Sequence, residues 1–246
     1  MKGIFSLFAV IVIQMMTHAQ QPTTIRISSD ATDLILKTAP NGRLYQAYFG
    51  DKLLADGDIK ELPYYIAHPA ADGAVTSRGF EVYPASGAED FFEPAFAIQH
   101  NDGNLTSILT YVSHTQKALD ANSSETVITL KDKVYPVEVK LYYQVFKKEN
   151  VMKSWTEIKH NEKKPVHISR YASNMLYFQA SKYFLTEFSG DWAKEVQMSS
   201  QPLQFGKKVL ETKLGSRAAM HSYPFFQIGL DQPVAESQGK VLLGTI

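Results

Sequence analysis

The chain has 246 residues, with 25 Lys and Arg against 25 Asp and Glu, and 12% of its residues are aromatic. A near-neutral chain has no electrostatic reason to bind nucleic acid or an anionic membrane surface, so neither is an expected partner. The absence of cysteine excludes a disulfide scaffold and a thiolate metal site, and it suits an exported bacterial protein better than a eukaryotic secreted one.

The chain begins with the features of a secretory signal peptide. Lys2 gives a positive start, residues 4–16 are mostly apolar, and Ala19 supplies a small residue before the cleavage point. The apolar stretch is shorter than the roughly 20 residues that a membrane-spanning helix requires. We therefore predict a signal peptide over residues 1–19, with a buried N-terminal helix and a retained anchor as the alternatives. No later stretch approaches spanning length, so no membrane span is expected.

Short β-prone segments separated by turn-forming residues dominate the rest of the chain. The clearest is 137–145, where apolar and polar residues alternate with the period of two that predicts a strand with one buried face. Similar strands are predicted at Thr24–Ser28, Leu34–Thr38, Leu44–Phe49, Ile108–Ser113, Thr126–Leu130, Met152–Lys159, Val166–Tyr171, Phe225–Leu230 and Val241–Ile246. Clusters of Gly, Asn, Asp, Pro and Lys end them, as turn chemistry requires.

This pattern predicts an all-β fold, an antiparallel β-sandwich. No stretch of 12 or more residues has the pattern of an amphipathic helix, and the nearest candidate, Thr115–Ala121, is predicted to be a loop with one helical turn. No repeat or linker marks a boundary, so one β-domain is predicted over residues 20–246. Because Gly239–Ile246 has the pattern of an unfinished strand, we expect a sandwich that is incomplete at its C-terminal end, in a fragment of a longer protein. A buried C-terminal strand is the alternative.

No established catalytic motif is present. The sequence lacks a Walker loop, a dinucleotide fingerprint, a zinc-protease histidine pair and a Gly-x-Ser-x-Gly elbow. The seven histidines have no metal-ligand spacing: His160 and His167 flank a predicted turn, and His114 and His221 stand alone. Each is interpreted as a hydrogen-bonded or surface residue. Neither a metal nor a cofactor is expected.

Two segments contain more aromatic, acidic and turn-forming residues than a sandwich core requires. In residues 83–95, two prolines and a glycine frame acidic and aromatic side chains, which predicts a rigid loop that presents them in fixed directions. In residues 188–195, Trp192 lies in a polar setting after a glycine, and an indole offers a flat apolar face and an N–H donor. Trp155, in contrast, lies within an alternating strand and is interpreted as core.

Four motifs occur in a fixed order. They are an aromatic-glycine strand at 44–50, a Tyr-Pro…Gly…Asp-Phe…Pro-Ala stretch at 83–95, Gly-Asp-Trp-Ala-Lys-Glu at 190–195, and Ser-Arg followed by Pro-Phe-Phe within 216–226. Together with the strand at 239–246, they resemble the N-terminal domain of the α-galactosidases of glycoside hydrolase family 36. The resemblance covers the chain from about Leu44 to its last residue, and the order of the motifs carries it.

The resemblance implies a β-sandwich that packs against a (β/α)₈ barrel beyond Ile246. It implies hydrolysis of terminal, non-reducing α-D-galactosides with retention, one aspartate of the barrel acting as nucleophile and another as acid/base. No catalytic residue is therefore expected in this chain, and the 246-residue fragment by itself is expected to be inactive.

In that family, the tryptophan of the Gly-x-Trp motif reaches the galactose pocket. Trp192 is thereby implied to bind substrate, with its neighbour Asp191 and with Asp90 of the Asp-Phe motif as accompanying candidates. Two departures stand out: Phe92 replaces the family's arginine after Asp-Phe, and residues 62–69 show no counterpart of a sugar-binding aspartate found in bacterial members. Specificity for galactose or for N-acetylgalactosamine stays open.

The expected partners are α-galactoside oligosaccharides, the protein's own downstream barrel and further copies of the protein, because members of the family often form homo-oligomers. The expected location is the bacterial periplasm, cell surface or extracellular space. A different class also stays open: a stand-alone β-sandwich that binds glycans or assembles with envelope proteins without catalysis. The coding sequence beyond Ile246 discriminates between the two.

Overall fold

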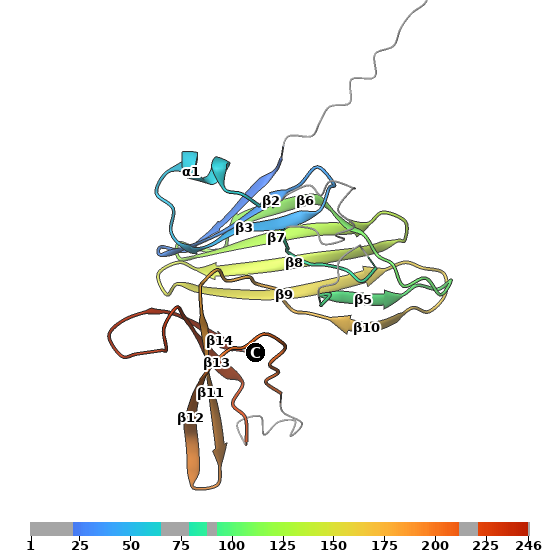
Figure 1. Cartoon of the computed structure of the whole chain (residues 1–246). Helices are drawn as coiled ribbons and strands as arrows, with labels where there is room; N and C mark the ends of the chain where they lie inside the picture. The colour runs from blue at the N-terminus through green and yellow to red at the C-terminus, as the bar shows by residue number, and fades with distance from the viewer. Residues whose placement is uncertain (1–21, 65–78, 88–92, 212–220, 246) are drawn as a thin grey trace, which may run out of the picture. The chain divides into compact units, whose positions relative to one another are not determined.

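The computed structural model describes residues 22–64, 79–87, 93–211 and 221–245. The predicted signal peptide over residues 1–19 lies outside the described residues. Figure 1 shows the strands, which form two compact units: unit 1 comprises residues 1–177, and unit 2 comprises residues 178–246. Each unit is described by itself, and the single β-domain expected over residues 20–246 stays a prediction.

The described residues of unit 1 form two four-stranded antiparallel sheets and one two-stranded sheet. The first large sheet has the order β1-β2-β3-β4, with bounds Thr24–Ser28, Thr32–Thr38, Leu44–Asp51 and Phe80–Glu81. The second has the order β6-β7-β8-β9, with bounds Leu109–Ala118, Ser123–Asp132, Val137–Phe146 and Val151–His160. The small sheet pairs β5 (Phe96–Gln99) with β10 (His167–Tyr171), and the helix α1 (Asp56–Glu61) follows β3.

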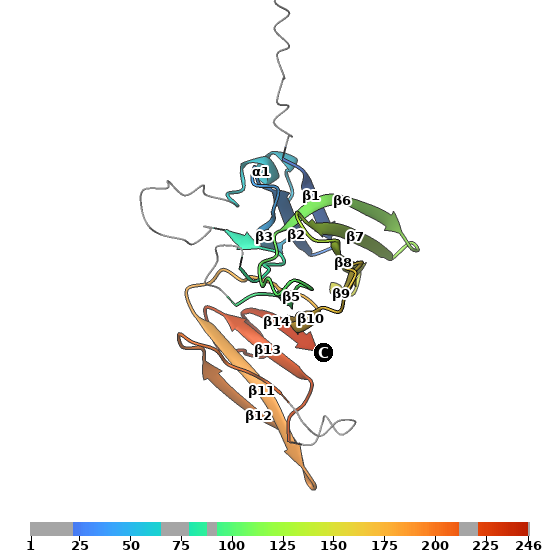
Figure 2. The same ribbon diagram turned by 90° about the vertical axis from the view of Figure 1, so that its right-hand side faces the viewer.

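The core of unit 1 lies between its two large sheets (Figure 1 and Figure 2). Strand β8 alternates strictly between buried and half-buried residues, as its sequence predicts. Val139 of β8 and Ile128 of β7 are fully buried, and they belong to the same apolar cluster as Ile25 of β1 and Leu34 of β2. The prediction of an all-β antiparallel sandwich is therefore confirmed.

Two interpretations of the sequence are wrong. The segment Thr115–Ala121 contains no helical turn, because β6 continues to Ala118 as an exposed strand that pairs with β7. Trp155 is not a core residue: it lies opposite Tyr142 in the register of β8 and β9, and Tyr142 is on the outer face of the sheet. The two rings stack there with their centroids 4.8 Å apart.

The described residues of unit 2 form one antiparallel sheet with the order β12-β11-β13-β14. Its strands are β11 (Tyr183–Asp191), β12 (Lys194–Pro202), β13 (Phe225–Leu230) and β14 (Lys240–Thr245). Strands β11 and β12 form a hairpin, and β11 continues past β13, which pairs only with Tyr183–Glu187. The sequence did not predict either strand of this hairpin, nor α1, β4 and β5.

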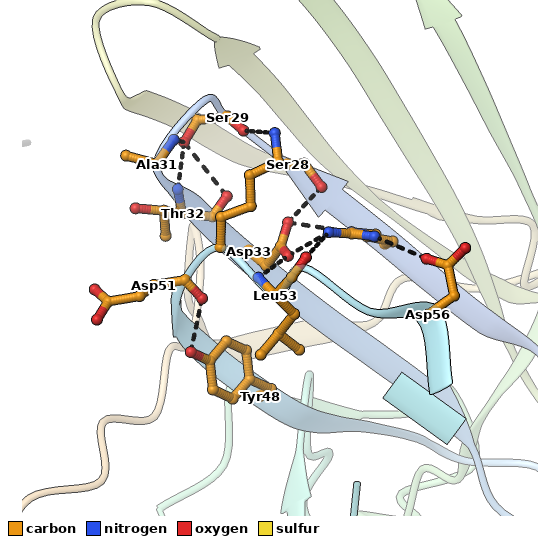
Figure 3. A network of polar contacts seen from close by, with 11 residues as sticks. Ser28, Ser29, Ala31, Thr32, Asp33, Tyr48, Asp51, Leu53 and Asp56 are labelled. Carbon is orange, nitrogen blue, oxygen red and sulfur yellow. Dashed lines mark hydrogen bonds and ion pairs between the residues drawn. The ribbon is translucent and has the colours of Figure 1, made fainter. Parts of the chain in front are cut away.

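A buried carboxylate ties β1, β2 and the chain after β3 together in unit 1 (Figure 3). The side chain of Asp33 is fully buried. It accepts hydrogen bonds from Arg26 Nη2 at 2.7 Å, from Ser28 Oγ at 2.5 Å and from the Leu53 backbone N–H at 2.8 Å. Arg26 also forms an ion pair with the exposed Asp56 at 3.2 Å. Burial by itself would raise the pKa of Asp33, but the hydrogen bonds from Arg26, Ser28 and Leu53 outweigh it and hold the pKa below its usual value.

We expect Asp33→Asn to lower the free energy of unfolding by about 2 kcal/mol at neutral pH, because an amide cannot accept all of these hydrogen bonds. A carboxylate with a lowered folded-state pKa stabilises the fold above its unfolded-state pKa, and this contribution is lost as the pH falls. Denaturant titrations should therefore show the wild-type advantage shrinking as the pH drops below the ordinary value of 3.8. The control is Asp30→Asn, at an exposed position. An advantage that persists in acid would contradict the assignment.

Candidate functional site

The turn of the β11–β12 hairpin carries the candidate site. Asp191 pairs with Lys194, so Trp192 and Ala193 form the two-residue connection. The Asp191 side chain accepts a hydrogen bond from the backbone N–H of Trp192, with 2.7 Å between Oδ1 and N. Ala193 has a φ of 59°, in the left-handed region that residues with a Cβ seldom adopt. The turn is thus held in a conformation that its residue types do not favour.

Trp192 does not pack against other residues of the described structure, in which 88% of its surface is exposed to solvent. Removing apolar surface from water normally stabilises a protein by about 25 cal/mol per Å², and an exposed indole forgoes most of that gain. Its chemistry suits a sugar, because the flat face can contact C–H bonds while Nε1–H donates a hydrogen bond. The exposed carboxylate of the adjacent Asp191 can accept a hydroxyl donor.

The other candidate segment is only partly described. Asp90 lies outside the described residues, so its role stays a prediction. In the described part of the same segment, Tyr83 is 1% exposed and donates its hydroxyl hydrogen bond to the Ala172 carbonyl at 2.9 Å. Ala85 is also buried and bridges to Phe96. Tyr83, Ala85 and Ala95 of this segment belong to the core of unit 1, whereas Glu93 is exposed.

A second arrangement, in unit 1, has the connectivity of a serine–histidine–acid triad. Ser107 Oγ lies 3.0 Å from His100 Nε2, and His100 Nδ1 lies 2.7 Å from Glu162 Oε1. Glu162 also accepts hydrogen bonds from the backbone and side chain of Asn101 at 2.9 and 2.7 Å, and the His100 ring stacks on Tyr135. No sequence motif predicts this set, because His100 and Ser107 lie in the connection after β5, whereas Glu162 lies in the connection after β9.

Burial rules out nucleophilic catalysis at this triad. Ser107 is 1% exposed, and the side chains of His100 and Glu162 are equally enclosed, so no substrate carbonyl can reach the serine hydroxyl. Burial would raise the pKa of Glu162, but hydrogen bonds from His100 and from the Asn101 backbone outweigh it and lower the pKa. Ser107, His100 and Glu162 therefore have a structural role: their hydrogen bonds hold the chain after β5 against the chain after β9.

A shallow hollow of about 250 Å³ lies in unit 1 beside β1, β6 and β7. Its charged lining is mixed in sign, and two of its residues, Lys117 and Glu125, form an ion pair at 3.0 Å. Gln116 crosses it to donate a hydrogen bond to the Arg26 carbonyl at 2.8 Å. Of the predicted site residues that the structure describes, neither Trp192 nor Asp191 lines this hollow.

Among the residues that the structure describes, no three His, Asp or Glu side chains lie close enough together to hold a metal ion. No helix in the described ranges is long and apolar enough to cross a bilayer. Within the described ranges, the candidate site therefore consists of Trp192 and Asp191 on the hairpin.

Comparison with known proteins decides the family. The model of the glycosyl hydrolase family 36 N-terminal domain matches residues 42–246. The chain belongs to this family. The match covers the region from about Leu44 onward in which the ordered motifs occur, and it includes the Gly-Asp-Trp-Ala-Lys-Glu stretch at 190–195.

The relatives that this family member matches are α-galactosidases. Probable alpha-galactosidase G of Aspergillus terreus is 26% identical over 188 residues, which is 70% of this chain and 26% of the relative. Alpha-galactosidase AgaA of Geobacillus stearothermophilus is 26% identical over 179 residues, which is 65% of this chain and 24% of the relative. The chain therefore spans about a quarter of the length of these curated relatives.

Solved structures show the same fold. A crystal structure of AgaA from Geobacillus stearothermophilus superposes with a TM-score of 0.76 at 21% identity, covering 89% of this chain and 33% of that chain. The alpha-galactosidase from Lactobacillus brevis gives a TM-score of 0.74 at 20% identity, covering 87% and 32%. Both likenesses include the β-sandwich and extend over most of this family member.

We expect Glu162→Gln to lower the free energy of unfolding by about 1–3 kcal/mol, because the amide leaves part of the buried donor set of His100 and Asn101 without an acceptor. The matched control is Glu236→Gln at an exposed position, which should change it by less than about 0.5 kcal/mol. Thermal and denaturant unfolding measure both. In the same preparations, a fluorophosphonate probe should leave Ser107 unlabelled; labelling of the folded chain at Ser107 would show that the triad is open to substrate.

Proposed function

We propose that this chain is the N-terminal part of an exported α-galactosidase that hydrolyses terminal, non-reducing α-D-galactosides with retention. The observation that carries the proposal is the exposed Trp192 on the β11–β12 hairpin, within a region that matches the family model. The names of the relatives support the activity, and variants of AgaA have been crystallised with raffinose and with stachyose.

In this proposal, the catalytic groups lie in a (β/α)₈ barrel encoded beyond Ile246. Retaining hydrolysis uses two carboxyl groups about 5–5.5 Å apart, one as nucleophile and one as acid/base. The β-sandwich supports the barrel, and the hairpin supplies one wall of the galactose pocket. Trp192 stacks against the C–H face of the sugar, and Asp191 and Asp90 accept hydrogen bonds from its hydroxyl groups.

The proposal places the protein outside the cytoplasm. It rests on Lys2, the apolar residues 4–16 and the small residue Ala19, which together have the pattern of a cleavable signal. Removal of residues 1–19 would leave Gln20 as the first residue of the exported form.

The 246-residue chain and a longer form that contains the coding sequence beyond Ile246 provide the main test. We expect the longer form to hydrolyse nitrophenyl α-galactoside and to release α-galactose first, which proton NMR detects before the anomers equilibrate. The 246-residue chain should show no turnover, because it lacks the predicted catalytic aspartates. Turnover by the short chain would place the catalytic pair within it, and a coding sequence that ends shortly after Ile246 would favour the non-catalytic glycan-binding class.

In the longer form, we expect Trp192→Ala to raise KM for the galactoside by about tenfold while it changes kcat less, because stacking on the sugar acts mainly on binding. Loss of an exposed side chain should leave the free energy of unfolding within about 0.5 kcal/mol of wild type. Trp155→Ala is the matched control: it removes the ring that stacks on Tyr142, so it should destabilise the fold without altering KM. An unchanged KM in Trp192→Ala would remove Trp192 from the pocket.

A further inference from the structure

The β11–β12 hairpin contains a β-bulge close to Trp192. Ser189 pairs with Gln197, and Asp191 pairs with Lys194. Between these pairs β11 has the single residue Gly190, while β12 has two residues, Glu195 and Val196. A bulge of this kind bends the strand and increases its twist, and bulges beside functional sites redirect a side chain. The bulge thus sets the direction in which the turn leaves the sheet.

The second bulge residue is strained. Val196 has a φ of 50°, in the left-handed region where glycine or asparagine is usual and a β-branched residue is an outlier. Its side chain is 51% exposed, so packing does not explain the choice of valine. A strained backbone persists only where neighbouring groups over-determine it, and such residues cluster at binding and catalytic sites. Some contact must therefore hold Val196 in place.

Tyr223 provides that contact. Its hydroxyl oxygen lies 3.3 Å from the backbone nitrogen of Val196 and accepts the hydrogen bond from that N–H. Tyr223 is itself fixed to the neighbouring strand, because its own N–H donates to the Phe188 carbonyl at 2.9 Å. Its ring packs edge-on against Phe225, with 5.6 Å between the centroids. The Tyr223 side chain thus links Phe225 of β13 to the strained bulge at Val196.

The other side of the bulge is held by the same segment of chain. The N–H of His221 donates to the carbonyl of Gly190 at 2.7 Å, and Gly190 is the residue that lies opposite the bulge. His221 also has a left-handed φ, 71°. Residues 221–223 therefore form hydrogen bonds with both strands of the hairpin close to its turn.

We propose that Tyr223 is a positioning residue for Trp192: its hydroxyl holds the bulge at Val196 in the left-handed conformation, and the bulge aims the indole. The inference rests on the proposed sugar-binding role of Trp192. A sugar ring stacks on the face of an indole and not on its edge. A hairpin that relaxes at Val196 would change its twist and turn that face away from a sugar held in a fixed place.

The test uses the 246-residue chain in a Trp155→Phe background, in which Trp192 is the only remaining tryptophan. Residual dipolar couplings of the N–H bonds of residues 191–194 and of the Trp192 indole report the direction of the turn relative to β13. Tyr223→Phe keeps the ring against Phe225 but removes the acceptor. We expect the population of redirected turns to rise by about fivefold, which is the effect of one hydrogen bond, with smaller couplings in the turn and unchanged couplings in β13.

A second substitution distinguishes a positioning role of Tyr223 from a general loss of order in the hairpin. Asparagine adopts the left-handed region far more readily than valine, so Tyr223→Phe combined with Val196→Asn should recover the couplings of the turn. Unchanged couplings in Tyr223→Phe, or no recovery in the double variant, would overturn the proposal. Methyl α-galactoside is added in a separate titration of the longer form that contains the proposed barrel, with the Trp192 indole resonance assigned by Trp192→Phe. An unmoved resonance would count against the sugar-binding role and leave the positioning result, measured without sugar, as it stands.

Discussion

In unit 1, each large sheet buries one face in a shared core, and this burial determines how the strands of the two sheets are arranged. Because Ile128 and Val139 belong to the same apolar cluster as Ile25 and Leu34, the pairing registers of β1 with β2 and of β7 with β8 are fixed, since a shift by one residue would turn the apolar face outward. Polar groups that this packing encloses then need complete sets of partners. The network around Asp33 meets that need.

Burial explains less of unit 2, because few side chains of its described sheet are completely buried. The β11–β12 hairpin continues beyond β13, and hydrogen bonds from residues 221–223 stabilise this extension. The left-handed Ala193 lies in the turn beside the exposed Trp192, and the left-handed Val196 lies in the bulge of β12 that follows the turn. A sequence that only specified a hairpin would favour glycine or asparagine at such positions. Departures from local preference are typical of sites that serve a ligand, and here they lie next to the one side chain best suited to a sugar.

The sequence predicts what depends on local periodicity. The alternation along β8 is visible because one face of the strand is buried and the other is not, whereas the end of β6 around Thr115–Ala121 is exposed on both faces and shows no such signal. The sequence predicts the wrong face for Trp155 because its strand alternates weakly, and only the register with Tyr142 decides the side. The triad of Ser107, His100 and Glu162 joins separate connections, so no spacing along the chain predicts it. Trp192 is predictable from its motif and its polar setting.

The central claim is that the β11–β12 hairpin brings Trp192 to the sugar. A crystal structure of the longer protein with raffinose bound tests this claim most directly. The account predicts that the indole of Trp192 lies within about 4 Å of the carbon atoms of the galactosyl ring, with its face toward them. A galactosyl ring bound by the barrel alone, with Trp192 exposed to solvent, would contradict it.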